Sequence, residues 1–122
     1  MLQAVRLPDG HFAINRNNVF EGGASGQCWW SVMCLILWIA LHHYGCRVLL
    51  DYVDNVFSHD FADAMVLYPR YRVLMPHNQR QLLSCFDDLD VPHDQPKQTH
   101  GVSQPIIGMQ VDALALSITM PP

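Results

Sequence analysis

The chain has 122 residues, of which 50% are hydrophobic and 15% charged, and its formal charge at pH 7 is −4. This length predicts one domain, residues 1–122, and the apolar content is sufficient for a core, which excludes a disordered tail. The seven Lys and Arg residues form no stripe, so a general phosphate-binding surface is excluded and nucleic acid is not an expected partner. No cofactor is expected.

The first part of the chain predicts a hairpin followed by a long helix. Strands are expected over residues 4–7 and 11–14, because Pro8-Asp9-Gly10 between them is a turn sequence. The apolar run from Val32 to Leu41 then predicts a helix that ends at Gly45, a residue favoured at helix C-termini. Because this helix is apolar on every side, it is expected to be the buried central helix of the domain.

The rest of the chain predicts a mixture of short helices and strands, and therefore an α+β fold. Helical spacing of apolar residues is found over residues 48–57, 62–67 and 78–86. Strands are expected over residues 71–74, 106–111 and 113–120. The polar stretch 87–98, which holds Pro92 and Pro96, predicts an exposed loop. Ser58 or Asp60 is expected to cap the helix over 62–67, and Pro69 to end it.

The four cysteines, Cys28, Cys34, Cys46 and Cys85, show no CxxC spacing, which favours free thiols in a reducing compartment. Cys34 lies inside the apolar run and is expected in the core. That run is shorter than the roughly 20 residues that a membrane span needs, so a membrane is not an expected partner.

The sequence Ser25-Gly26-Gln27-Cys28-Trp29-Trp30 places one cysteine where a glycine-rich loop meets the long helix. The free N–H groups and the positive dipole end of a helix favour a thiolate, so Cys28 is a candidate nucleophile. The alternative is that Cys28 is simply a buried cysteine.

A thiol nucleophile needs a base, and His100 is the preferred candidate because it directly precedes the last predicted strands. His77 and His93 remain alternatives. Asp112 is the only acid after His100, and it is a weak candidate for a third, orienting group. Such a third group is optional in Cys–His chemistry.

The residues Gly26, Cys28 and Trp29 at the head of a hydrophobic helix resemble the Cys-Trp motif of papain-like cysteine peptidases. Together with the later pair Thr99-His100, they most resemble the papain-like leader proteinases of arteriviruses and related nidoviruses. The resemblance covers two short patches. It implies a central helix and flanking helices on a small antiparallel sheet that carries His100.

The resemblance also implies an activity. Cys28 and His100 would hydrolyse a peptide bond through a thioester, with Gln27 and Trp29 at the substrate cleft. The substrate would be a polypeptide, including the chain's own C-terminus, and residues 113–122 would then remain in the cleft. A second role against host proteins, in the cytoplasm of a host cell, would be expected of such a family.

Other interpretations remain open. Trp29, Trp30 and Trp38 are expected to be packing residues, although their number permits a homodimer surface. His42 and Cys46, with Cys28 or Cys85 and a later histidine, could form a zinc site. The acidic residues Asp51, Asp54, Asp87, Asp88 and Asp90 are expected on the solvated surface. The functional alternative to a peptidase is a non-catalytic binding protein, either a degenerate papain-like fold or a small membrane-associated accessory protein.

Overall fold

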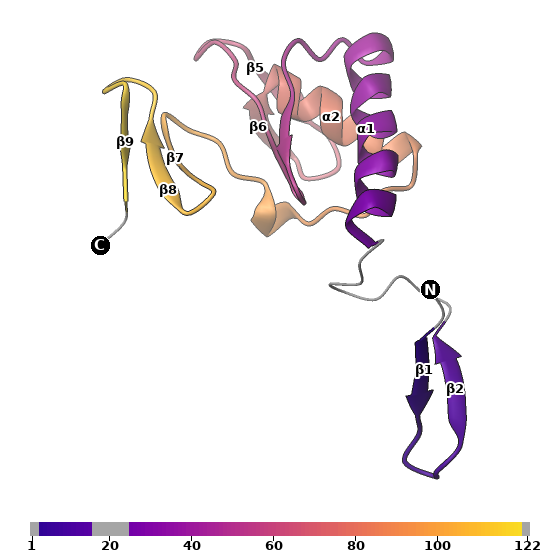
Figure 1. Ribbon diagram of the computed structural model, residues 1–122. Coiled ribbons are helices and arrows are strands. Elements are labelled where there is room, and N and C mark those ends of the chain that lie inside the picture. The colour runs from indigo at the N-terminus through magenta and orange to yellow at the C-terminus, as the bar shows by residue number, and fades with distance from the viewer. Residues whose placement is uncertain (1–2, 16–24, 121–122) are drawn as a thin grey trace.

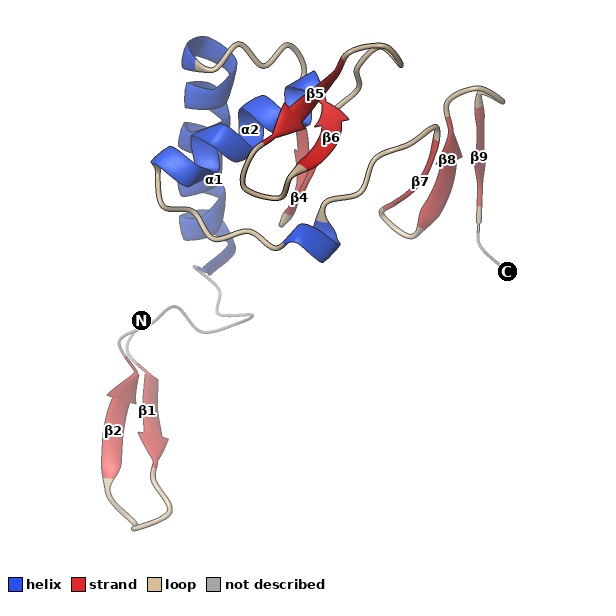
Figure 2. Cartoon of the chain, turned by 180° about the vertical axis from the view of Figure 1, so that it is seen from behind, coloured by secondary structure: helices blue, strands red, loops and turns tan. Residues whose placement is uncertain are grey.

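Helices and antiparallel strands alternate along the chain, which confirms the predicted α+β class. The computed structural model describes residues 3–15 and 25–120. Both helices and four central strands form a body, while the N-terminal hairpin and the C-terminal sheet project from it (Figures 1 and 2). Residues 22–24, part of the predicted glycine-rich loop, lie outside the described residues.

The predicted N-terminal hairpin is confirmed. Strand β1 (Gln3–Arg6) pairs antiparallel with β2 (Phe12–Asn15). Gly10 has a φ of 86°, a value that an L-residue with a side chain rarely adopts, which explains why glycine occupies this turn position.

Helix α1 (Ser25–His43) begins and ends as the sequence predicts. Cys28 lies in its first turn, and Gly45, with a φ of 73°, follows its last residues. The carbonyl of Ala40 accepts from the N–H groups of both Tyr44 and Cys46, at 3.3 and 3.2 Å, which closes the helix end.

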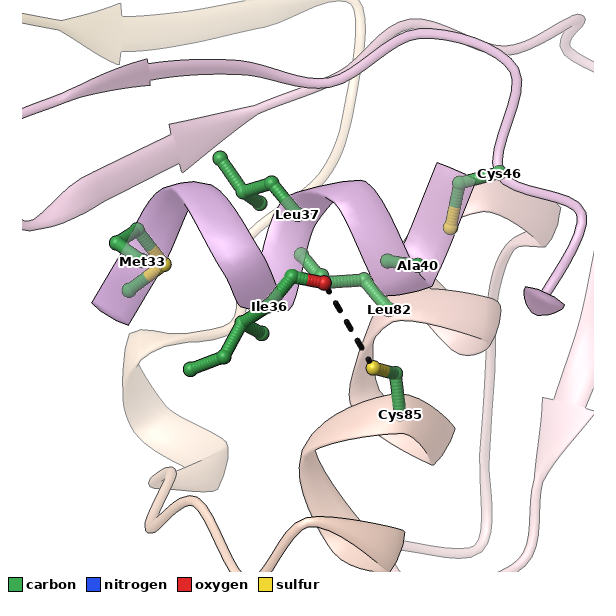
Figure 3. Packing of buried hydrophobic residues seen from close by; sticks show 7 residues of the cluster. All are labelled: Met33, Ile36, Leu37, Ala40, Cys46, Leu82 and Cys85. Carbon is green, nitrogen blue, oxygen red and sulfur yellow. Dashed lines mark hydrogen bonds between the residues drawn. The ribbon is translucent and has the colours of Figure 1, made fainter. Parts of the chain in front are cut away.

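The prediction that α1 is buried on every side is wrong. Its buried residues, which all lie on one face, are Met33, Ile36, Leu37 and Ala40. This face packs on Leu82 and Cys85 of α2 (His77–Asp88), and Figure 3 shows the contact. Val56 of β4 (Asn55–Phe57) also packs against this cluster, while the opposite side of α1 is exposed in the part of the chain that the structure describes. Cys34 is therefore exposed rather than in the core. Trp29, Trp30 and Trp38, expected to be packing residues, are 42%, 49% and 51% exposed.

Two hairpins replace the helices expected over residues 48–57 and 62–67. Strands β3 (Leu50–Tyr52) and β4 (Asn55–Phe57) pair with each other, as do β5 (Met65–Tyr68) and β6 (Val73–Pro76). The turns contain Val53 and Arg72 at φ values of 58° and 56°, conformations that sequence patterns do not predict for these residue types. The strand expected over 71–74 is present but begins two residues later.

Helix α2 confirms the prediction for residues 78–86, with Leu82 and Leu83 buried. Its first turn is capped from elsewhere in the chain, because the Asn78 N–H donates to Asp60 Oδ2 at 2.7 Å. The prediction that Ser58 or Asp60 caps a helix over 62–67 is wrong, because that helix is absent and Asp60 instead accepts from the start of α2.

The C-terminal region contains a three-stranded sheet instead of the predicted strand pair. A short helix η1 (Gln95–Lys97) precedes β7 (Ser103–Ile106), β8 (Met109–Asp112) and β9 (Ser117–Thr119), which pair in that order. A tight turn at Gly108, with a φ of 73°, divides the first expected strand. Within the described chain, this sheet contacts neither helix.

Candidate functional site

Cys28 is exposed on the first turn of α1, where the helix N-terminus meets solvent. The neighbouring Trp29 fixes this end of the helix, since its indole Nε1 donates to the carbonyl of Val53 in the β3–β4 turn at 2.6 Å. Gln27 is also exposed, and its carbonyl accepts a hydrogen bond from Ser31 Oγ at 2.9 Å. The predicted nucleophile and cleft residues therefore share one accessible helix end.

His100 is exposed and lies between η1 and β7. It lines an open groove of about 440 Å³, together with Tyr71, Val73, Met75, Gln95, Pro96 and Gln98. Among the described contacts, no hydrogen bond or ring contact joins His100 to Cys28. The pairing of these two side chains remains a prediction, and a base in an unliganded enzyme is often away from its final position.

His93, predicted in an exposed loop, instead belongs to a polar cluster, and its side chain is only 3% exposed. Its Nε2 lies 3.0 Å from Asp87 Oδ1, and its Nδ1 lies 2.5 Å from the hydroxyl of Tyr71. Tyr68 and Arg70 complete this Asp87 cluster, because both donate hydrogen bonds to the Asp87 carboxylate. The prediction that Asp87 is a solvated surface residue is thus wrong.

The charges of the Asp87 cluster favour the ionised carboxylate. Burial tends to raise the pKa of Asp87, but the hydrogen bonds from Tyr68, His93 and Arg70 outweigh it, so the pKa is lowered overall. Burial and the bond to Asp87 raise the pKa of Tyr68, and burial raises that of Tyr71. Both phenols therefore stay protonated and serve as donors.

The Asp87 cluster ties three segments together: the end of α2, the β5–β6 turn and the loop that leads to His100. It thereby positions one wall of the groove, because Tyr71 belongs to both the cluster and the groove. Sequence reasoning missed this cluster because the strand pairing of β5 and β6 creates it. The only local signal was a histidine six residues after an aspartate.

Replacing Asp87 by asparagine is expected to destabilise the fold at neutral pH by roughly 2 kcal/mol, since donors aimed at a carboxylate lose their charged acceptor. Because the pKa of Asp87 is lower in the folded protein than in the unfolded chain, its ionised carboxylate stabilises the fold at neutral pH. This stabilisation is lost as the pH falls below about 4, where the carboxylate takes up a proton. Urea unfolding at pH 7 and at pH 3 measures both effects. The exposed Asp90→Asn serves as the control, and equal losses in the two variants would contradict the assignment.

The other residues predicted as a base, an orienting acid or zinc ligands lie elsewhere in the fold. His77 begins α2 and lines a second groove, of about 290 Å³. Asp112 Oδ1 accepts hydrogen bonds from the N–H groups of Leu114 and Ala115, at 2.9 and 2.8 Å, so it shapes the β8–β9 turn. No group of three potential metal ligands occurs within residues 3–15 and 25–120, so the zinc alternative gains no support.

All four cysteines are free thiols, in two pairs of different character. Cys46 and Cys85 are buried, and burial raises the pKa of both, to about 11 for Cys46. Cys28 and Cys34 are exposed on α1. Thiol chemistry at neutral pH is therefore restricted to this helix.

No protein-family model, no curated protein and no solved structure matches the chain. The class of the protein is accordingly set by its own geometry, as an α+β protein with an accessible thiol at the start of its longest helix.

Proposed function

We propose that the protein is a cysteine peptidase of papain-like organisation in which Cys28 is the nucleophile. The observation that supports this proposal is the exposed thiol on the first turn of a 19-residue helix. Free backbone N–H groups at a helix N-terminus stabilise a thiolate, and afterwards the oxyanion of an acyl intermediate. Trp29, held on the β3–β4 turn, would form a fixed wall beside the thiol.

In the proposed reaction, His100 takes the thiol proton and the sulfur of Cys28 attacks the carbonyl carbon of the scissile peptide. The C–N bond then breaks as the imidazolium gives its proton to the leaving amine, and a thioester remains. Water, deprotonated by the same imidazole, hydrolyses this thioester. His100 lies between η1 and β7, and the proposed reaction requires that it approach Cys28 when the substrate binds.

The proposed substrate is a polypeptide, with the chain's own C-terminal region as the first case. Residues 117–119 of that region form β9, an edge strand paired with β8. An extended edge strand has a row of free backbone groups and is the conformation in which peptidases bind their substrates. We also propose that the protein acts in the cytoplasm of a host cell, where host proteins would be further substrates.

Selective alkylation tests the nucleophile. Cys28 and Cys34 are both exposed on α1, so Cys34 is a matched control for accessibility. We expect iodoacetamide to modify Cys28 about tenfold faster than Cys34, because only Cys28 lies on the first turn of the helix, where a nucleophile is expected. Peptide mapping by mass spectrometry after timed quenching gives both rates. Equal rates would contradict the proposal.

A second function is favoured by the uncovered apolar face of α1. Trp30, Val32, Leu35 and Trp38 are each about half exposed. Leu35 and Trp38, three residues apart, are neighbours on the outward side of the helix, and exposed apolar surface is typical of interaction sites. A binding or accessory protein that acts by contact alone would use this face and would not depend on Cys28 chemistry.

A further inference from the structure

The groove that His100 lines is formed by two separate parts of the chain. One is the β5–β6 hairpin, and the other is η1 with the residues that follow it. The volume of the groove, about 440 Å³, falls in the range of about 300 to 1,000 Å³ that is usual for ligand sites. The groove therefore has the size of a binding site.

Buried polar contacts hold the two parts of the groove together. The Tyr71 hydroxyl lies 2.5 Å from Nδ1 of His93 and 3.1 Å from its carbonyl oxygen, two residues before η1 begins. The ring of Tyr71 also packs edge-on against Tyr68, with the ring centroids 5.0 Å apart. A ligand therefore meets a lining that is already ordered, which lowers the free-energy cost of binding.

The part of the groove formed by β6 is apolar and uncharged. Val73 and Met75 both line the groove, and Leu74 between them is 59% exposed on the other face of the strand. Among the described residues that line the groove there is no Asp, Glu, Lys or Arg. A charged ligand group would lose water there without gaining an ion pair. The groove therefore favours an uncharged, apolar side chain.

Two polar side chains of the lining are available to a ligand. The amide of Gln95 and the imidazole of His100 make no hydrogen bond within the part of the chain that the structure describes. The Gln98 amide, in contrast, already donates to the carbonyl of Asp94 at 3.3 Å. A glutamine amide carries both donors and an acceptor, so it matches the N–H and C=O of a peptide group. A polypeptide with an apolar side chain fits both kinds of surface.

We propose that this groove binds a polypeptide segment through an uncharged apolar side chain, which packs on Val73 and Met75 while a neighbouring peptide group bonds to Gln95. The binding does not require the thiol of Cys28. Because His100 also lines the groove, the bound side chain would lie close to the proposed base. An apolar residue next to the cleaved bond is then the preferred substrate, and this last step rests on the proposed function.

Peptide binding to the Cys28→Ala protein tests the groove in the absence of cleavage. The probes are three fluorescein-labelled pentapeptides with blocked ends, which differ only in a central leucine, lysine or glutamate. Fluorescence anisotropy is expected to show at least tenfold tighter binding of the leucine peptide than of the other two. Equal affinities for the three peptides would overturn the proposal.

Two pairs of variants locate the bound peptide. Val73→Ala is expected to weaken binding of the leucine peptide at least threefold, whereas Leu74→Ala, on the other face of β6, should leave it unchanged. Gln95→Glu places a charge at the groove without touching the core, and it should favour the lysine peptide over the glutamate peptide at least threefold. Asn55→Asp makes the same change of charge at an exposed position outside the groove and should cause no such preference. Unchanged binding in both Val73→Ala and Gln95→Glu would overturn the proposal.

The binding proposal and the peptidase proposal fail in different ways. Selective binding of the leucine peptide by Cys28→Ala, with no cleavage by the unaltered chain, would reject the peptidase and keep the groove as a binding site. Cleavage by the unaltered chain, with equal affinities for the three peptides, would reject the groove and keep the peptidase.

Discussion

Release of a reporter protein fused behind the chain is expected to cease when Cys28 is replaced by alanine. No other group can form the thioester in the proposed mechanism, and loss of a covalent nucleophile typically costs at least about 10⁴-fold in rate. Gel electrophoresis of the purified fusion over time follows the release of the reporter. Full cleavage in Cys28→Ala would reject the peptidase proposal.

Two sets of variants make this result specific. Cys34→Ala removes an exposed thiol from the same helix and is expected to cleave at the normal rate. His100→Ala is expected to abolish cleavage, whereas His77→Ala should retain it. His93→Ala removes a member of the Asp87 cluster, so its unfolding curve must be measured beside its activity. Loss of cleavage in a folded His77→Ala variant, with activity kept in His100→Ala, would move the base to His77.

Features that depend on a few neighbouring residues could be predicted from the sequence. Gly10 and Gly45 both adopt a positive φ, the conformation that a local turn or helix end needs, and the elements beside them have the expected positions. Helix α2 could also be predicted from the sequence, because its apolar residues repeat on one face. The position of Cys28 in the first turn of α1 follows from the same local signals.

Features that depend on pairing between distant segments could not be predicted. The apolar spacing in residues 48–57 fits a helix as well as two strands of three residues, and the turn at Val53 decides between them through a backbone conformation unusual for valine. The exposure of α1 escaped prediction for a related reason. An apolar helix implies a covered helix, but in the described residues α1 packs along one face and leaves the other exposed.

The candidate site likewise has one part that could be predicted from the sequence and one that could not. Local sequence predicts the exposed helix start with Cys28, but the residues around His100 depend on how the chain returns after α2. The Asp87 cluster forms there through contacts of Tyr68, Tyr71 and His93 that no spacing rule anticipates. Buried polar contacts of this kind fix the path of a loop more strongly than its own sequence does.

Replacing Asn78 by leucine is expected to destabilise the protein by roughly 3 kcal/mol, although the two side chains are of similar size. Asn78 is 1% exposed and is the buried polar residue at the start of α2. Its Nδ2 donates to the carbonyl of His59 at 2.8 Å, and its Oδ1 accepts from the N–H of Arg47 at 3.0 Å. Leucine would leave both of these backbone groups without a partner, and each unpaired buried group costs about 1–3 kcal/mol.

The loss at Asn78 should appear in urea unfolding as a lower midpoint with an unchanged slope, because the compactness of the folded and unfolded states stays the same. Asn55→Leu is the matched control, since Asn55 is exposed and its amide bonds only to the neighbouring Asp54. Its effect should stay within about 0.5 kcal/mol. Equal midpoints for the two variants would show that the contacts of Asn78 do not hold the β4–β5 connection against α2. A large difference would establish Asn78 as the residue that joins the loop before β3, the β4–β5 connection and α2 into one body.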